Sequence, residues 1–440
     1  MNGRPIKTKA RIAKFLNLSF IYVAGLTPAG HEVEVEDDFF EELDYDEPVD
    51  LVGLTAMTSQ APRAYQIAEE YRKRGVKTVM GGFHASFCPE EASEKVDAVV
   101  IGEAEPVWGE VVKDASAGQL KKFYRAELLE SLSGLPAPRY DLVKNKRQVY
   151  TYYPLWAGKG CPLNCKFCSV TAFYGNQYRS RPVKDIIRDA SLIPTKLVFI
   201  IDDNLGAYGD ALYQLLPELM RFKFRWIAQI DYRFALNEKL LDMAKEAGME
   251  LGYIGFETIF PDRLQNIGKG WAKRELYEKA IRNLHRWGIA VAASVMFGIG
   301  PENPDTVRET LDFFIDQKVD VLALYFYTPA PGTQLFKELT EQGINFSKDW
   351  VRYDGTFPVL FYEGSSWEEM EDLYWSFYQG FYRVGSIMKR FFRIPYGPKF
   401  WLIYLGKNLL IFRVDVNHRR SMFYNGVSYL DILSGFSPIS

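Results

Sequence analysis

The second part of the chain alternates short apolar segments with amphipathic stretches six times, and this alternation limits the folds open to it. The apolar segments are residues 149–160, 196–204, 225–231, 251–258, 290–299 and 321–329. Helix-like stretches such as 210–222, 237–248 and 306–317 separate them. Strands that alternate with helices form parallel sheets. Six such units predict a partial barrel, open on one side, with its chemistry at the carboxyl ends of the strands.

The first third of the chain shows the same alternation on a smaller scale. The predicted strands are 31–37, 49–57, 76–82 and 96–103. The second of these is nearly all apolar, as expected for a strand buried on both faces. An amphipathic helix over 61–75 follows it and ends at a glycine. The pattern predicts a doubly wound, Rossmann-type parallel sheet that binds ligands at the carboxyl ends of its strands.

A chain of 440 residues exceeds what one hydrophobic core usually supports, so we expect several domains of α/β class. The doubly wound domain should cover 1–135. A linker rich in proline and serine leads to the barrel, and we place it at 136–148. The barrel should cover 149–343, and an α-rich, aromatic C-terminal region should cover 344–440.

Composition excludes some functions. The net charge of −3 and the absence of a basic domain argue against nucleic acid as a partner. The basic first residues lead into no signal-peptide core, and the apolar run 16–26 is too short to span a bilayer. Of the four cysteines, three lie within eight residues, which is a metal-ligand pattern and favours a reducing, cytoplasmic location.

The C-terminal region is unusually aromatic. One predicted helix carries Tyr374, Trp375, Phe377, Tyr378, Phe381 and Tyr382. The following segment, 391–413, mixes aromatic residues with arginine and lysine. A helical cap over the mouth of the barrel is one interpretation. Peripheral contact with a membrane, for a lipid-like substrate, is the other.

The three clustered cysteines are Cys161, Cys165 and Cys168, spaced C-x3-C-x2-C directly after the first barrel strand. Three thiolates at this spacing can hold a cuboidal iron–sulfur cluster and leave one iron without a protein ligand. A substrate or cofactor can then bind that iron. A zinc site is the alternative, but it needs a fourth ligand, and all four histidines are distant in sequence.

This motif and the order of strands and helices resemble the radical S-adenosylmethionine superfamily over residues 149–340. The resemblance implies that the cysteines hold a 4Fe–4S cluster whose open iron binds the amino and carboxylate groups of S-adenosylmethionine. Reductive cleavage would then give a deoxyadenosyl radical that abstracts a substrate hydrogen. The cofactors carry this chemistry, and the protein positions them. Such an enzyme needs an electron donor, for example a flavodoxin or a ferredoxin.

The resemblance also assigns residues near the carboxyl ends of the barrel strands to S-adenosylmethionine. These candidates are Phe167, Asp202, Asp203, Glu257, Ser294 and Gly298. Phe167 takes the position that packs near the adenine, and Glu257 takes that of the residue that binds the ribose hydroxyls. Asp202 and Asp203 end the second strand, where the family commonly binds the methionine ammonium. Adjacent side chains in a strand point to opposite faces, so only one of the two should contribute. Ser294 and Gly298 lie near the expected ribose and carboxylate contacts.

The N-terminal domain resembles the cobalamin-binding module that precedes many enzymes of this superfamily. Segments 54–58, 81–86 and 100–105 carry the resemblance. It gives five candidates for cobalamin contact: Thr55, Thr58, Gly81, Gly82 and His84. The glycines would let the backbone approach the nucleotide tail of the cofactor. The family's Asp-x-His-x-x-Gly loop is absent, so bound cobalamin should lack a lower axial histidine from it. Alternatively, the domain has lost cobalamin and serves as a structural lid.

Together these resemblances imply a cobalamin-dependent methyltransferase that methylates an unactivated carbon. The substrate should be a large, apolar small molecule such as a lipid, a tetrapyrrole or a natural product. A methylthiotransferase needs three further cysteines in the N-terminal domain, and only Cys88 lies there. A non-methylating radical enzyme, such as a cyclase, a carbon–carbon coupling enzyme or an epimerase, remains open. A non-enzymatic iron–sulfur protein is the third alternative.

Overall fold

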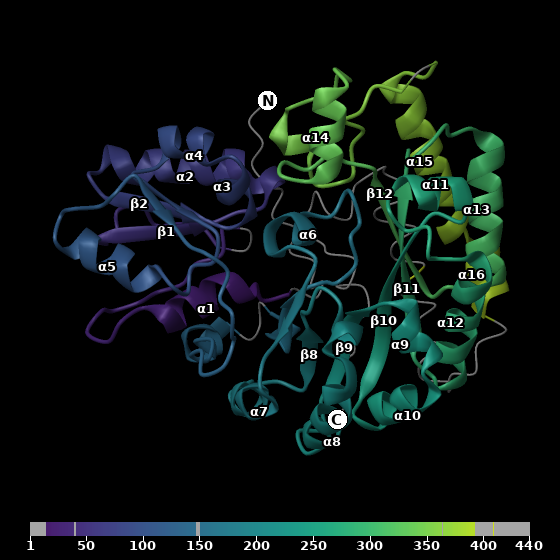
Figure 1. Cartoon of the computed structure of the whole chain (residues 1–440), viewed down its shortest axis with the longest axis horizontal. Helices are drawn as coiled ribbons and strands as arrows, with labels where there is room; N and C mark the ends of the chain where they lie inside the picture. The colour runs from purple at the N-terminus through teal and green to yellow at the C-terminus, as the bar shows by residue number, and fades with distance from the viewer. Residues whose placement is uncertain (1–14, 39–40, 147–149, 363, 392–407, 409–440) are drawn as a thin grey trace.

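The computed structural model describes residues 15–38, 41–146, 150–362, 364–391 and 408. Two parallel sheets follow one another in the chain, and helices of the C-terminal region pack on the second sheet (Figure 1). This arrangement confirms the predicted α/β class. Within these ranges no helix is long and apolar enough to cross a membrane.

The N-terminal sheet is parallel, with four strands in the order β1-β2-β3-β4. The strands are β1 (Leu51–Thr55), β2 (Lys77–Gly81), β3 (Ala98–Ile101) and β4 (Phe123–Arg125). The helices on one face are α2 (Ala61–Lys73), α3 (Phe83–Phe87) and α4 (Pro89–Lys95), and those on the other are α1 (Leu18–Leu26) and α5 (Trp108–Ser116) (Figure 1). Met80 and Val99 pack with the first group, and their strand neighbours Val79 and Val100 pack with the second. The sheet is therefore doubly wound.

Two strand predictions in this domain need correction. Residues 31–37 form no strand in the part of the chain that the structure describes, and their side chains are exposed or half-buried. The segment predicted as a strand buried on both faces becomes β1, which lies at the edge of the sheet and is half-exposed along its length. Leu54 packs with the helices on one face of the sheet and Leu51 packs with those on the other, which explains the apolar run. The strands predicted at 76–82 and 96–103 and the helix at 61–75 are confirmed.

The second sheet is a parallel array of six strands in the order β12-β11-β10-β9-β8-β5. The strands are β5 (Tyr153–Leu155), β8 (Leu197–Ile200), β9 (Arg225–Ile230), β10 (Met249–Glu257), β11 (Ala290–Phe297) and β12 (Val321–Phe326). The helices between them include α7 (Val183–Ala190), α8 (Leu212–Met220), α10 (Glu238–Glu246), α12 (Arg274–Arg286) and α13 (Pro304–Asp316). Because β5 and β12 do not pair with each other, the barrel stays open, as predicted.

The first predicted barrel strand divides in two. Its beginning is β5, and its end is β6 (Gly158–Gly160), which pairs antiparallel with β7 (Tyr178–Ser180). The cysteine loop and the short helix α6 (Ser169–Tyr174) lie between β6 and β7. This hairpin therefore holds both ends of the cysteine segment.

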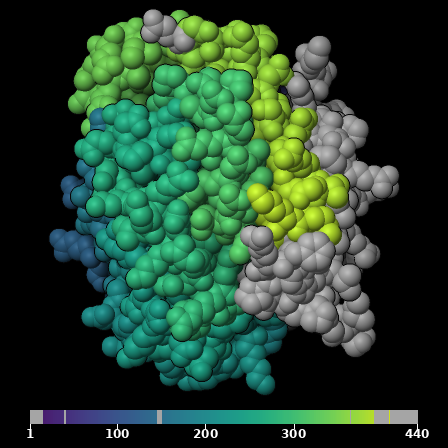
Figure 2. Space-filling view, turned by 90° about the vertical axis from the view of Figure 1, so that its right-hand side faces the viewer, coloured from purple at the N-terminus to yellow at the C-terminus, as the bar shows by residue number. Residues whose placement is uncertain are grey.

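The C-terminal region adds α14 (Gln334–Glu341), α15 (Trp367–Tyr382) and α16 (Val384–Phe391), and its outer face is visible in Figure 2. Helix α15 lies along the open edge of the barrel and not over its mouth, which corrects the prediction of a cap there. The Tyr374 hydroxyl donates to the Leu324 carbonyl at 2.9 Å, and the Leu324 amide donates to the Tyr378 hydroxyl at 2.9 Å. The tyrosine hydroxyls of α15 thus form hydrogen bonds with backbone groups on the outer edge of β12. Most of the segment 391–413 lies outside the described residues.

Candidate active site

The three clustered cysteines follow β6 and end at the start of α6. None is in a disulfide, and Cys165 is buried. Burial is the main cause that raises the pKa of Cys165 to about 12, and negative charge on Cys168 and Cys161 contributes in the same direction. Backbone amides of the loop and of α6 hydrogen-bond to the sulfurs of Cys161 and Cys168. Buried thiols with amide donors and no disulfide fit a metal that displaces their protons, as an iron–sulfur cluster does.

The two aspartates that end β8 have different surroundings. Asp202 is fully buried, and its carboxylate accepts the Ala157 amide at 2.7 Å and the Tyr178 hydroxyl at 2.5 Å. Asp203 accepts the Gly160 amide at 2.9 Å. Its charge acts on the thiols of Cys161 and Cys168. Burial raises the pKa of Asp202 to about 7 and that of Asp203 to about 6. Asp203 is therefore the one of the pair that borders the cysteines, and its contact with methionine remains a prediction.

Asn204, which follows Asp203, belongs to a polar triad beside Cys161 whose other two members, Asp231 and Arg233, were not predicted from the sequence. The Asn204 amide lies 3.8 Å from the Cys161 sulfur and donates to Asp231 at 3.2 Å. Arg233 donates to the same carboxylate at 2.9 and 2.5 Å. Asp231 also caps α9 (Tyr232–Leu236). The sequence did hold one signal for Asp231: it directly follows the third barrel strand, and residues at the carboxyl ends of strands carry the chemistry in this fold.

Glu257 ends β10 in a left-handed backbone conformation, with φ of 61°, which a residue with a Cβ rarely adopts. Lys269, which follows α11 (Pro261–Asn266), donates to its Oε1 at 2.6 Å and to the Gly255 carbonyl at 3.2 Å. The other carboxylate oxygen, Oε2, is buried without a hydrogen-bond partner. The positive charge of Lys269 also acts on Cys165. An unpartnered buried acceptor beside the cluster loop fits a ribose hydroxyl, and this assignment remains a prediction.

Ser294 belongs to a group of hydroxyls inside the barrel. It lies on β11 opposite Gly255 and hydrogen-bonds to the Tyr253 hydroxyl. The Tyr253 and Tyr325 hydroxyls are 3.1 Å apart. Three neighbouring strands thus each supply one hydroxyl, which gives the barrel interior a polar group able to orient a bound molecule.

Gly298 follows β11 with φ of 86°, and a Cβ there would lie 2.4 Å from the Tyr362 hydroxyl. Only glycine fits this approach. The Tyr362 hydroxyl is buried and lacks a hydrogen-bond partner, so it is a further polar group available to a ligand. Nothing in the sequence pointed to it, because it comes from the C-terminal region. Phe167 is half-buried near Tyr327, with their ring centroids 6.2 Å apart.

The carboxyl edge of the N-terminal sheet presents the predicted cobalamin contacts. Thr55 is exposed at the end of β1, and Thr58 is buried just beyond it. Gly82 has φ of 94°, and a Cβ there would meet the Thr55 hydroxyl at 3.0 Å. Gly81 carries no comparable steric demand, since a Cβ would find ordinary contacts. The edge therefore has a glycine whose conformation and close contact with the end of β1 leave no room for a side chain, and its contact with cobalamin remains a prediction.

His84 is turned into the protein. It is fully buried, and its Nε2 lies 2.9 Å from the Tyr65 hydroxyl, which donates to Glu91 at 3.1 Å. Trp350 donates to both oxygens of Glu91 at 3.1 and 3.0 Å. Cys88 lies close enough to complete a possible metal-ligand set with His84 and Glu91. However, burial raises the pKa of Cys88 to about 11, and the carboxylate is already engaged, so the group fits a packing network better than a metal site.

The two domains meet next to the cysteine loop. Phe83, directly after Gly82, packs on Phe173 of α6 with ring centroids 4.8 Å apart. Phe87 contacts the same ring at 6.1 Å. Because α6 begins directly after Cys168, the predicted cobalamin edge lies beside the predicted cluster.

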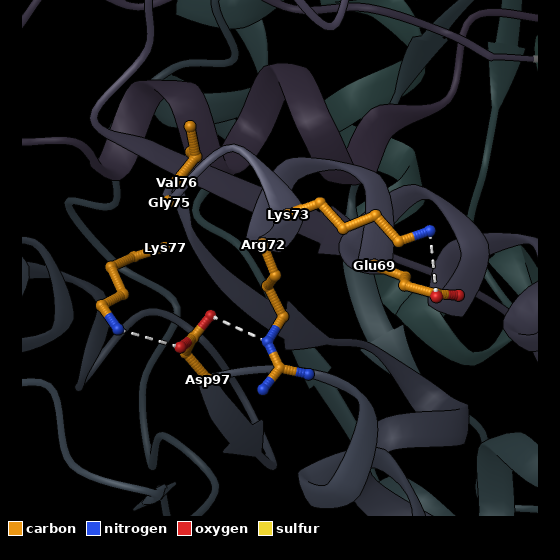
Figure 3. Close-up of a pocket in the computed structure, with 7 residues that line it drawn as sticks. All are labelled: Glu69, Arg72, Lys73, Gly75, Val76, Lys77 and Asp97. Atoms are coloured by element: carbon orange, nitrogen blue, oxygen red, sulfur yellow. Dashed lines mark hydrogen bonds and ion pairs between the residues drawn. The ribbon is translucent and has the colours of Figure 1, made fainter.

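A shallow hollow on the N-terminal domain lies elsewhere (Figure 3). It sits between the end of α2 and the starts of β2 and β3, away from their carboxyl ends. Its charged side chains are paired: Lys73 with Glu69 and Lys77 with Asp97, both at 3.1 Å. We regard it as a solvated, charged face without a catalytic role.

Two family models match this chain, one for each of its parallel sheets. Residues 157–314 match the model of the radical SAM superfamily, and residues 14–112 match that of the B12 binding domain. The chain is 30% identical over 352 residues to a bacteriochlorophyllide d C-12(1)-methyltransferase of Chlorobaculum tepidum, covering 78% of this chain and 76% of that protein. It is 26% identical to an anaerobic magnesium-protoporphyrin IX monomethyl ester cyclase of Rubrivivax gelatinosus, covering 85% and 74%.

It is also 21% identical to a hopanoid C-2 methylase of Rhodopseudomonas palustris, covering 67% of this chain and 58% of that protein. Among solved structures, the fold resembles the cobalamin-dependent S-adenosylmethionine radical enzyme OxsB with aqua-cobalamin and S-adenosylmethionine bound. The TM-score is 0.65 at 14% identity, and the match covers 96% of this chain and 72% of that one.

Proposed function

Because the chain belongs to the radical S-adenosylmethionine superfamily, among its cobalamin-dependent methyltransferases with an N-terminal B12-binding domain, we propose that it methylates an unactivated carbon of a large, apolar substrate. The enzyme uses a 4Fe–4S cluster, S-adenosylmethionine and cobalamin. When bound, the first two supply the means to abstract a hydrogen atom, and cobalamin supplies the methyl group. A reduced flavodoxin or ferredoxin is the electron donor that this proposal requires.

The contact between Phe83 and Phe173 carries the proposal. It joins the loop after Gly82, on the cobalamin edge, to the helix that starts after Cys168. Methyl transfer needs the methyl donor next to the carbon from which hydrogen is removed. The residues of the chain serve this need by holding the two cofactor edges together, while Asp203, Glu257 and the barrel hydroxyls would orient S-adenosylmethionine.

The substrate class rests on two observations. Three half-buried aromatic residues belong to the barrel: Tyr253 in the middle of β10, Tyr325 near the end of β12 and Phe167 in the cysteine loop. Relatives of this chain carry the names of enzymes for bacteriochlorophyllide and hopanoid, both large ring systems. A flat or polycyclic substrate suits rings of this kind better than a small polar one.

A cyclase is the second candidate. One relative, 26% identical over 424 residues, is a ring-forming cyclase for a magnesium porphyrin ester. Such a reaction adds no methyl group to its substrate, so the fate of the methyl group separates the two candidates.

The deciding experiment uses the full chain, reconstituted with iron, sulfide and cobalamin without oxygen. S-adenosylmethionine with a trideuterated methyl group and a lipid and pigment extract of a strain lacking the gene are added with reductant. Methylation predicts deoxyadenosine together with an extract component that gains the labelled methyl group. Deoxyadenosine with a changed but unlabelled component would favour the cyclase. No deoxyadenosine above the level of a Cys165→Ala variant would refute both.

A further inference from the structure

The β6–β7 hairpin carries two cations directly opposite each other. Lys159 on β6 pairs in register with Arg179 on β7. Like charges at opposite positions of an antiparallel pair destabilise it unless something compensates them. Both side chains are largely buried, at 17% and 8% exposure, so water does little to screen them. Their compensation must therefore come from other protein groups.

Two carboxylates of the N-terminal domain supply it. Arg179 donates to both oxygens of Glu103, at 2.8 and 2.9 Å, in a bidentate pair. Lys159 lies 3.1 Å from Glu103 and also donates to Glu105. Glu103 and Glu105 are 1% and 4% exposed, which makes this a closed group of two positive and two negative charges. Bidentate arginine–carboxylate pairs fix geometry as well as adding energy.

The network is completed by the backbone. The Leu129 amide donates to Glu103 at 2.8 Å, and Arg179 donates to the Leu129 carbonyl at 2.7 Å. Burial pushes the pKa of Glu103 upward, but Arg179 and Lys159 hold it below the usual value. The carboxylate therefore stays charged in the folded protein at neutral pH.

The position of these residues links the two cofactor sites. Lys159 comes two residues before Cys161, at the start of the cluster loop. Glu103 follows Gly102, which has φ of 90°, at the carboxyl end of β3. The four charges thus tie the edge that binds cobalamin to the hairpin that holds the cluster loop.

We propose that Glu103, Glu105, Lys159 and Arg179 form a positioning clamp that sets the distance and orientation of cobalamin relative to the 4Fe–4S cluster. None of them is a catalytic residue, because their charged groups form ion pairs with one another. The clamp requires only that both cofactors bind, and it does not depend on which substrate is methylated.

The test measures the geometry directly. The full chain is reconstituted with the cluster and cobalamin, and both are brought to their paramagnetic states, reduced cluster and cob(II)alamin. Electron paramagnetic resonance then reports their magnetic interaction. Glu103→Gln keeps the size of the side chain and removes its charge, and Lys159→Met tests the clamp from the other domain. We expect both variants to lose or broaden the magnetic interaction seen in the unaltered enzyme.

Hydrogen exchange of segments 83–87 and 169–174, on the two sides of the contact, should become roughly tenfold faster or more, the effect of losing one charged, buried hydrogen bond. Deoxyadenosine formation should persist, because every residue predicted to bind the cluster or S-adenosylmethionine lies in the barrel. Glu250→Gln is the control for loss of a bidentate pair within the barrel: its partner Arg225 donates at 2.6 and 3.1 Å, at the opposite end of the barrel strands, and the two side chains are 35% and 37% exposed.

Three results would overturn the clamp. The first is the absence of any difference in magnetic interaction between the unaltered enzyme and both clamp variants. This outcome includes the case in which none of the three proteins shows an interaction. The second is an equal change in Glu250→Gln. The third is loss of the cluster itself, which would make these residues part of the cluster fold and not a link between domains. Failure of the substrate assay would still leave the magnetic interaction and the hydrogen exchange as readouts of the clamp, so the two proposals can fail separately.

Discussion

Replacing Lys269 by methionine, alone and together with Glu257, should distinguish the contribution of Glu257 to stability from its predicted role in binding S-adenosylmethionine. The two side chains are 8% and 7% exposed, and their charged groups meet at 2.6 Å. The second oxygen of Glu257 already lacks a partner. In the Lys269→Met variant the whole carboxylate would be buried without compensation.

The expected size follows from that burial. Removing one partner of a buried ion pair costs about 3–5 kcal/mol, since it leaves an unpaired charge. For a domain the size of the barrel, 1 kcal/mol corresponds to about 2–4 °C in Tm. The unfolding transition of the barrel should therefore fall by roughly 6–20 °C. Glu257→Met should have a loss of similar size, because it leaves the ammonium of Lys269 unpaired.

The double variant, with both residues replaced by methionine, is the decisive comparison. Replacing a buried pair by apolar residues of similar volume is often neutral or stabilising, so the double variant should recover most of the lost Tm. All three proteins keep residue 257 in its left-handed conformation, so that strain cancels. The assay is calorimetry of the three proteins, paired with binding of S-adenosylmethionine to the reconstituted forms.

In the double variant, thermal stability and S-adenosylmethionine binding should change in opposite directions. We expect the double variant to regain stability but to bind S-adenosylmethionine roughly tenfold more weakly or worse, the effect of one lost charged hydrogen bond. Single variants that each lose less than about 1 kcal/mol would show that the pair is effectively solvated. A double variant that binds S-adenosylmethionine normally would remove Glu257 from the site.

Three further outcomes follow from the structure. Gly82→Ala should weaken cobalamin binding in a spectroscopic titration, because its Cβ would press on Thr55 at 3.0 Å; Gly118→Ala, also at positive φ but with no atom within 4 Å, should bind normally. Cys165→Ala should abolish cluster iron, whereas Cys88→Ala should retain full iron content by metal analysis. For Asp202, a folded pKa of about 7 lies above the unfolded value of about 4. The folded protein then holds the extra proton between these values, so stability should fall as pH rises through this window, and Asp202→Asn should flatten the Tm–pH profile of the cluster-free protein.

The fold could be predicted because its signals are local. Each barrel strand is an apolar run followed by an amphipathic stretch, so the strand count and open architecture followed from periodicity alone. The errors arise where pairing depends on distant partners. Residues 31–37 alternate like a strand, yet among the described residues no neighbouring strand pairs with them. The aromatic residues of α15 were placed in the right element, but the sequence could not show that Tyr378 would bond to the backbone of β12.

The residues of the site also fall into two groups, those that local sequence patterns predict and those that depend on distant partners. The cysteine loop and the pair Asp202 and Asp203 could be placed at one edge because they directly follow predicted barrel strands. Lys269 could not, because it lies in a loop twelve residues after Glu257 and only the fold brings its ammonium to the carboxylate. Tyr362 and the clamp are more remote still: Glu103 and Arg179 are 76 residues apart and come from different domains. The predicted cofactor ligands thus follow local patterns, whereas the groups that we propose to hold one cofactor against another are set by the docking of domains. A variant that leaves every predicted ligand intact could for that reason still separate hydrogen abstraction from methyl transfer, and the clamp is where we expect such variants to occur.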